Sequence, residues 1–266
     1  MDLANWVKQA PDKPLYPNLL WSRPENRQLA GKLLIIGGNP HSFRAPAATF
    51  GYAEKAGVGV ARVVLPASLA KTVGQSAAET TFAPSNPSGG FAKAAIADFM
   101  ELSSWADLTL IAGDLGNNSE TDILLESFVD KYQGLLCLTG DSLNSFMPNA
   151  TNLFNRLNTA LFLDFAQLQK LVASLKSPSK FVSSMNLLNI IDELNNLTVQ
   201  YPVCLTVIHE NLLLVSYDGK TSTTPISHSD HLQAIASYGS VWWLQNINNI
   251  FEAFTTAAYE LASNKS

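Results

Sequence analysis

A run of apolar residues that ends in paired glycines constrains the fold more than any other feature of this chain. Residues 31–39 read Gly-Lys-Leu-Leu-Ile-Ile-Gly-Gly-Asn, and a second glycine turn within residues 55–60 leads into another apolar run. Glycine allows tight turns and a close approach of neighbouring backbone. A buried strand, a helix and a second buried strand at this spacing predict the start of an α/β domain with a parallel sheet.

The same alternation continues through most of the chain. We expect strands at 33–37, 58–65, 107–112, 135–139 and 161–163, with helices at about 46–56, 67–78, 91–102, 120–131, 165–175 and 181–195. Strands at 203–208 and 212–217 flank a tight turn, which predicts an antiparallel hairpin at one edge of the sheet. The predicted fold class is therefore α/β, with a mostly parallel central sheet, helices on both faces and a late antiparallel hairpin.

The two ends of the chain differ in character. Residues 1–30 carry four prolines, which disfavour a long helix and predict an N-terminal arm that packs on the domain formed by residues 31–266. We expect two tryptophans and two leucines to anchor this arm: Trp6, Leu19, Leu20 and Trp21.

Three further segments lie outside the alternating pattern. The prolines and glycines within 81–90 predict a surface loop, and the serines and threonines after Gly219 predict a polar loop that runs to Asp230. Asp230 is a candidate N-cap for a helix that begins near Leu232. A final helix is expected at about 247–262.

Composition limits the classes of partner. The chain has 266 residues, 47% of them hydrophobic and 15% charged, with a net charge of −5. We expect no nucleic-acid partner, because no basic field would attract phosphate backbones. No segment is apolar enough to span a membrane, so we expect a cytoplasmic protein. Cys137 and Cys204 lie in apolar runs, which predicts buried, reduced thiols.

The glycine-rich opening resembles the ADP/ATP-dependent NAD(P)H-hydrate dehydratases, which belong to the ribokinase-like superfamily. That family has Gly-Gly-Ser at a strand end, a Gly-Ala-Pro or Gly-Ala-Ala turn, and a helix that closes with Arg-Ala-Gly-Ala-Gly. Here the matching residues are Gly38 and Asn39, Ala45 in the Arg-Ala-Pro turn, and Lys-Ala-Gly-Val-Gly at 55–59. The resemblance implies a ribokinase-like fold, with Gly38, Asn39 and Ala45 in the substrate or nucleotide site.

Two later blocks match the family in part. Residues 112–116, Ala-Gly-Asp-Leu-Gly, stand where the family has Gly-Pro-Gly-Leu-Gly, so Gly116 is a candidate for the phosphate side of the site. The alternative is a simple strand-to-helix turn. Asp114 would bring a negative charge into this loop, which disfavours an anionic ligand. Asp141 matches the second aspartate of the family's Asp-Ala-Asp block. The resemblance implies that its carboxylate orders Mg²⁺ or water near the nucleotide phosphates. The alternative is that Asp141 caps a helix.

Other family positions carry different residues in this chain. Gln167 lies in the stretch where the family has a glutamate, and Ile208 stands where the family has a nucleotide-binding lysine. We align residues 237–244 with the family's Gly-Thr-Gly-Asp-Val-Leu-Ala-Gly, in which glycines and a helix N-terminus bind the phosphoryl group and the aspartate acts as base. Gly239 then remains as part of the anion site, and Ser240 occupies the catalytic aspartate position.

These departures predict a diverged dehydratase-like protein with little or no catalytic power, and what it binds is expected to be either a nucleotide-type ligand or a partner protein. No catalytic residue is assigned, because a serine hydroxyl is a poor base near neutral pH. The resemblance implies ATP or ADP with Mg²⁺ as cofactors if the family activity survives. The alternatives are an active ADP/ATP-dependent NAD(P)HX dehydratase, a small-molecule kinase, and a scaffold protein without a ligand.

Two remaining features concern metals and assembly. His228, Asp230 and His231 form a compact cluster with metal-ligating side chains but no fourth ligand, so a solvated loop is the alternative and no metal is assigned. Trp242 and Trp243 are adjacent on a predicted helix, where either both contribute to an interface or each packs inside the domain. We expect a homo-oligomer.

Overall fold

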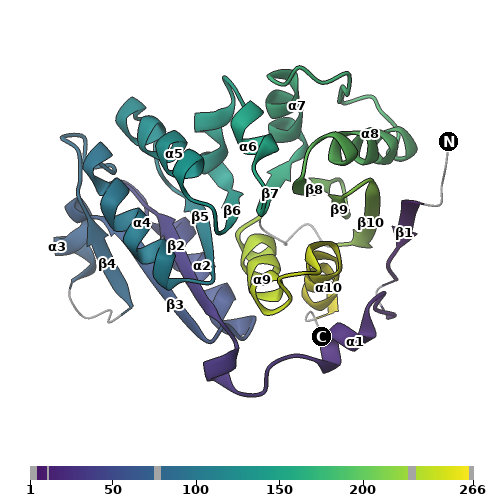
Figure 1. The fold of residues 1–266 in the computed structure, drawn as a ribbon, viewed down its shortest axis with the longest axis horizontal. Helices are drawn as coiled ribbons and strands as arrows, with labels where there is room; N and C mark the ends of the chain where they lie inside the picture. Colours follow the sequence, from purple (N-terminus) through teal and green to yellow (C-terminus); the bar gives the residue numbers. More distant parts are fainter. Residues whose placement is uncertain (1–4, 11, 75–78, 227–231, 264–266) are drawn as a thin grey trace.

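The computed structural model describes residues 5–10, 12–74, 79–226 and 232–263 of the chain. Its described strands form one ten-stranded sheet in the order β1-β10-β9-β8-β7-β6-β5-β2-β3-β4, which runs across Figure 1 from β1 at the right to β4 at the left. The strands from β4 to β8 are parallel, β9 is antiparallel to both of its neighbours, and β1 is parallel to β10. The fold class predicted from the sequence is confirmed.

The strands have the following bounds: β1 Trp6–Lys8, β2 Lys32–Gly37, β3 Val60–Pro66, β4 Thr80–Ala83, β5 Leu108–Gly113, β6 Leu135–Thr139, β7 Thr159–Asp164, β8 Val203–His209, β9 Leu212–Tyr217 and β10 Lys220–Pro225. The central strands β5 and β6 are buried along their whole length and largely apolar because both faces of the sheet are covered.

Helices cover both faces of the sheet. One face is covered by α4 Ile96–Trp105, α5 Ser119–Lys131, α6 Thr151–Asn155, α7 Phe165–Ala173 and α8 Leu187–Gln200, with the short helices η4 Lys93–Ala95 and η5 Gly140–Phe146. The other is covered by α1 Pro17–Trp21, α2 Arg44–Lys55, α9 Leu232–Gln245 and α10 Ile250–Ser263. Two short helices, η2 Arg27–Leu29 and η3 Ala67–Leu69, precede β2 and α3 Ala70–Val73.

The hairpin of β8 and β9 forms where it was predicted, but it does not lie at the edge of the sheet. The expected polar loop after Gly219 is wrong, because its serines and threonines form β10, and β1 pairs beyond it. Side-chain hydroxyl groups of this buried strand are hydrogen-bonded. Thr221 Oγ1 donates to Asn195 Oδ1 at 2.6 Å, and the hydroxyl oxygens of Ser222 and Thr255 lie 2.7 Å apart. Hydrogen bonding removes the usual cost of burying hydroxyl groups.

The N-terminal arm is anchored through β1. Trp6 Nε1 donates to Thr223 Oγ1 at 3.0 Å, and the buried Gln9 amide donates to Thr224 Oγ1 and to the Thr255 carbonyl. Leu19 packs into the core, whereas Trp21 is 88% exposed, so its predicted anchoring role is wrong.

Helix and loop bounds differ from the predictions in three other places. The helix expected over 67–78 ends at Val73 in the described chain, followed by Gly74 with a φ of +74°. The loop expected over 81–90 begins with the edge strand β4, and the helix expected from residue 181 begins only at Leu187.

Both cysteines and both adjacent tryptophans are buried. Cys137 and Cys204 are free thiols beneath α9 and α10, and burial raises the pKa of Cys137 to about 12. Trp242 and Trp243 are 1% and 2% exposed, so neither contributes to a surface patch. Their indole nitrogens donate within the chain, to Glu260 and to the Ile247 carbonyl.

Gly239 lies in the interior of α9, seven residues after Leu232, and not at a helix N-terminus. A Cβ atom at this position would lie 2.6 Å from Phe254 and 2.9 Å from Phe162. The glycine therefore allows α9 to pack closely against α10 and the sheet. The alignment that placed residues 237–244 at a helix N-terminus is wrong.

Replacing this glycine tests the packing explanation. We expect Gly239→Ala to lower the free energy of unfolding by about 1–3 kcal/mol, because the added methyl group overpacks the contact with Phe254. Gly51→Ala in α2 is the matched control, since no atom lies within 4 Å of its Cβ position. It should raise stability by up to about 1 kcal/mol. Urea unfolding of both variants gives the comparison, and equal stabilisation by the two would contradict the packing role.

Candidate functional site

The carboxyl ends of β2, β5 and β6 bring most of the predicted site residues together. Gly38 N donates to Gly113 O at 3.1 Å, so the ends of β2 and β5 touch. A Cβ atom on the preceding Gly37 would lie 2.5 Å from the same oxygen, which explains the need for glycine there. In open α/β sheets, ligands bind outside the carboxyl ends of the strands. This edge is therefore the candidate site.

Asp114 links the end of β5 to the start of α2. Its Oδ2 atom accepts hydrogen bonds from Ser42 Oγ and from the Ala45 backbone amide, each at 2.7 Å. Asn39 Nδ2 donates to the Asp114 carbonyl at 2.6 Å and holds the backbone, which adopts a left-handed φ of +57°. The sequence predicted that this charge would enter the glycine loop; instead, the carboxylate caps the helix.

Asp141 makes a second contact of the same kind. Its carboxylate accepts from the backbone amides of Leu115 and Gly116, with distances to Oδ2 of 3.0 and 3.2 Å. Burial raises the pKa of the Asp141 carboxyl group, the two amides oppose this rise, and the negative charge of Asp114 adds to it. The predicted residues Asp141 and Gly116 are therefore in direct contact.

Gly239 and Ser240 lie apart from this cluster. Both are buried inside α9, so neither offers an amide or a hydroxyl group at the start of that helix. The residues that precede α9 in the sequence are 227–231, and they lie outside the described residues, as does the predicted His228, Asp230 and His231 cluster. Within the described chain, no three His, Cys, Asp or Glu side chains group in a way that would hold a metal ion.

Two glutamine side chains extend the site and were not predicted as functional. Gln167 completes a capping box with Asp164 at the start of α7 and donates from Nε2 to the Gly140 carbonyl at 2.8 Å. Gln233, in the first turn of α9, lies near Gly140 and lines the cavity described below. The Asp-x-x-Gln spacing at 164–167 is the sequence signal that could have identified the capping box.

The end of β8 carries no lysine. Ile208 packs against the α9 face of the sheet, and the His209 ring lies 4.8 Å from the Phe165 ring, centre to centre. This edge of the site therefore presents an aliphatic and an aromatic surface.

A cavity of about 370 Å³ opens at the start of α2, beside Asp114. It is lined by Ser42, Arg44, Ala45, Ala48, Tyr52, Asp114 and Gln233. Arg44 is exposed, and the other polar groups are hydroxyl groups, an amide and one carboxylate. The cavity is suited to a ligand that carries hydroxyl groups and a ring for Tyr52.

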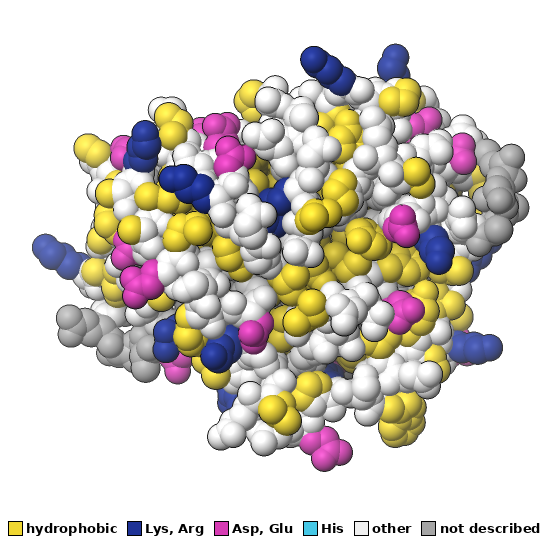
Figure 2. All heavy atoms as spheres, viewed as in Figure 1, with side chains coloured by type: hydrophobic (Ala, Val, Ile, Leu, Met, Phe, Trp, Pro, Cys, Tyr) yellow, Lys and Arg dark blue, Asp and Glu magenta, His cyan; other side chains and the backbone are white. Residues whose placement is uncertain are grey.

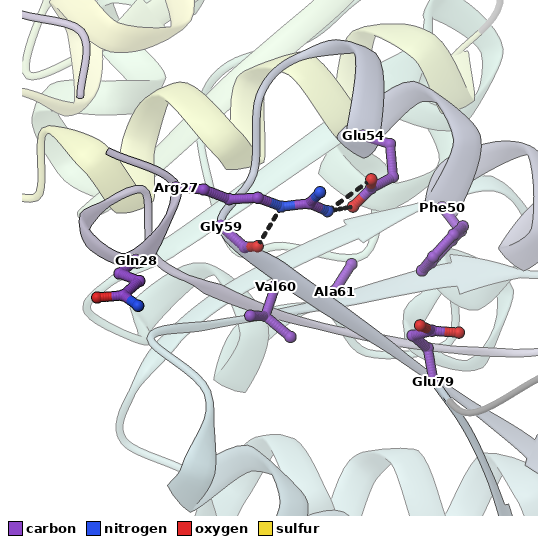
Figure 3. A pocket seen from close by; sticks show the side chains of 8 residues that line it. All are labelled: Arg27, Gln28, Phe50, Glu54, Gly59, Val60, Ala61 and Glu79. Carbon is purple, nitrogen blue, oxygen red and sulfur yellow. Dashed lines mark hydrogen bonds and ion pairs between the residues drawn. The ribbon is translucent and has the colours of Figure 1, made fainter. Parts of the chain in front are cut away.

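A larger cavity of about 440 Å³ lies at the amino end of β3, away from this site (Figure 3). Arg27 borders it, but its guanidinium group is occupied by Glu54, at 2.7 and 2.8 Å, and by the Gly59 carbonyl. The remaining wall is formed largely by Phe50, Val60 and Ala61. Because this larger cavity lies at the amino ends of the strands, it is a weaker candidate for a ligand site than the cavity beside Asp114.

The molecular surface carries few charges. On the face shown in Figure 2, basic and acidic side chains are scattered and intermixed, and no stripe of one sign is visible. Within the described ranges, no helix combines the length and the apolar character needed to cross a membrane.

Comparisons with known proteins identify the fold. No family model matches the chain, and no curated protein matches it significantly. A ribokinase-like superfamily protein from Enterococcus faecalis matches with a TM-score of 0.70 at 12% identity, covering 98% of this chain and 88% of that one. A hypothetical protein from Streptococcus mutans gives 0.66 at 14%, with coverages of 91% and 84%. The chain therefore has the ribokinase-like fold.

A member of the dehydratase family that the sequence resembles also shares this fold. The ADP/ATP-dependent NAD(P)H-hydrate dehydratase from Bacillus subtilis, co-crystallised with ATP/Mg²⁺, matches with a TM-score of 0.58 at 12% identity, and the match covers 94% of this chain and 87% of that one. At this identity, the likeness is one of fold.

The raised pKa of Asp141 predicts a pH dependence of stability. The folded state binds the Asp141 proton more tightly than the unfolded state, so this group's contribution falls as pH rises through the folded pKa. We expect the stability of Asp141→Asn, relative to the wild type, to increase from about pH 4 towards pH 7. Urea unfolding across this range measures the difference, with Asp192→Asn, at an exposed position of α8, as the baseline. A difference that falls over the same range would contradict the assignment.

Proposed function

We propose that the protein is a diverged relative of the NAD(P)H-hydrate dehydratases that binds the hydroxylated part of a nucleotide-type ligand and has little or no phosphoryl-transfer activity. The observation that carries this proposal is the occupation of the loop amides at the carboxyl edge. Ala45, Leu115 and Gly116 all donate to carboxylates of the chain itself. These amides are not free to bind a phosphate group.

The charges around the site support the same conclusion. A phosphate chain needs cationic or amide donors, and ATP arrives with several negative charges. Asp114 and Asp141 are both acidic, and Ile208 supplies no cation at the end of β8. The described residues therefore do not fit the triphosphate of ATP in the manner that the family resemblance implies.

Ser240 gives no support for low activity. That residue is buried inside α9, and the sequence directly before this helix contains Asp230, which lies outside the described residues. The proposal rests on the occupied amides and the absent lysine. An assay must therefore decide whether any turnover remains.

A ligand screen joined to an activity assay tests the proposal. A ligand that binds only the folded protein raises its melting temperature. We expect at least one of ATP, ADP, AMP, NADH and NADPH to raise the melting temperature. In the activity assay, we expect no ADP- or ATP-dependent recovery of NADH absorbance from hydrated NADH. Ala48→Phe should abolish the rise because the ring fills the cavity, whereas Ala97→Phe, at an exposed position of α4, should preserve it.

The contrary outcomes would point to two of the three alternative functions, an active dehydratase or a scaffold protein. If the wild type recovers NADH from hydrated NADH with ADP or ATP, and Asp230→Asn abolishes this turnover, the protein is an active dehydratase and the proposal is refuted. The absence of any thermal shift, with or without Mg²⁺, would favour a scaffold protein. The burial of Trp242 and Trp243 has already removed the surface feature that supported a scaffold.

A further inference from the structure

We propose that Asp114 is a built-in anion that sets the specificity of the α2 cavity: it excludes phosphate from the start of α2 and selects an uncharged, hydroxyl-bearing ligand group such as a nucleoside ribose. This inference rests on the proposed function, because it names the part of the ligand that the cavity holds. It concerns a residue that stands where the resembling family has a glycine.

The contacts of Asp114 match those that a bound anion would make. Its Oδ2 atom accepts from the Ala45 amide at the start of α2 and from the Ser42 hydroxyl group, each at 2.7 Å. A helix N-terminus stabilises negative charge there, and an intramolecular carboxylate supplies it without the entropy cost of binding an ion. The carboxylate therefore already fills the position that a phosphate oxygen would take.

The backbone holds this carboxylate in place. Asp114 adopts a left-handed conformation, with a φ of +57°, and Asn39 fixes its carbonyl group with a 2.6 Å hydrogen bond. Asp141, the neighbouring acid, is held in turn by Leu115 and Gly116. A phosphate group at the start of α2 would have to displace the first carboxylate and approach the second, against the repulsion of like charges.

One oxygen of Asp114 remains for a ligand. No hydrogen-bond partner of Oδ1 is found in the part of the chain that the structure describes, and Asp114 borders the cavity beside Tyr52 and Gln233. A hydroxyl group can donate to this oxygen in a charge-assisted hydrogen bond, whereas an ionised phosphate oxygen cannot and is repelled by it. Arg44 is exposed at the rim, where solvent screens its charge.

Inorganic phosphate is the probe that tests this role without knowledge of the natural ligand. Asp114→Gly removes the carboxylate, and glycine adopts the left-handed backbone easily. We expect its melting temperature to rise by about 2–4 °C when phosphate exceeds the dissociation constant about tenfold, relative to chloride at equal ionic strength. The wild type should show no such rise.

Asp164→Gly is the matched control, because Asp164 also caps a helix start through its carboxylate, at α7, but does not border this cavity. It should gain no phosphate response. Asp114→Asn keeps an acceptor and tolerates the left-handed backbone, so it should respond less than the glycine variant and more than the wild type. The proposal would be overturned if phosphate raised the melting temperatures of the wild type and Asp114→Gly equally. It would also be overturned if phosphate raised the melting temperature of neither Asp114 variant.

A second arm separates this inference from the proposed function. Adenosine should shift the wild-type melting temperature at least as much as AMP, and Asp114→Gly should reverse that order. If no nucleoside or nucleotide binds the wild type, the proposed function fails while the phosphate arm still decides the role of Asp114. Stronger binding of AMP than of adenosine by the wild type would overturn the selectivity.

Discussion

Two carboxylate-to-amide contacts hold the carboxyl edge of the sheet together. Asp114 joins the end of β5 to the helix that follows β2, and Asp141 joins the start of η5 to the loop that follows β5. Three successive strand ends are therefore cross-linked by charge-assisted hydrogen bonds, which are stronger than those between neutral groups. The shape and charge of the α2 cavity follow from this arrangement.

Under the proposed function, the same contacts account for a ribokinase-like fold that keeps its shape without phosphate chemistry. Backbone amides at strand and helix ends bind an external anion only when no internal acceptor reaches them. Here the chain supplies its own acceptors, so these amides are already hydrogen-bonded without a nucleotide. A cavity with a ring, hydroxyl groups and one carboxylate remains, and its chemistry suits the neutral part of a ligand.

The sequence predicted the strands from β2 to β8 that form the parallel centre of the sheet, apart from the edge strand β4, because each of them is a largely apolar run. It also predicted that Gly38, Asn39, Ala45, Gly116 and Asp141 belong to one site, and the structure places these residues around the joined strand ends. That they bind a ligand stays a prediction. The direction of the Asp114 side chain was not predictable, because it depends on Ser42 and Ala45 from another strand–helix unit.

The wrong predictions share a physical cause. Each concerns a residue whose environment is set by tertiary contacts that the local sequence does not reveal. The threonines and serines of β10 resemble a polar loop until Asn195 and Thr255 are placed beside them. Gly239 resembles part of an anion-binding turn until Phe254 is seen to pack against it. For Trp242 and Trp243 the sequence left an interface and interior packing both open, and partners in α10 and after α9 decide for the interior.

A crystal structure of the wild-type protein, grown from concentrated phosphate, measures the central contact directly. The account predicts Asp114 Oδ2 within hydrogen-bonding distance of the Ala45 amide and no anion at the start of α2. A phosphate bound to that amide, with the Asp114 side chain rotated away, would contradict it.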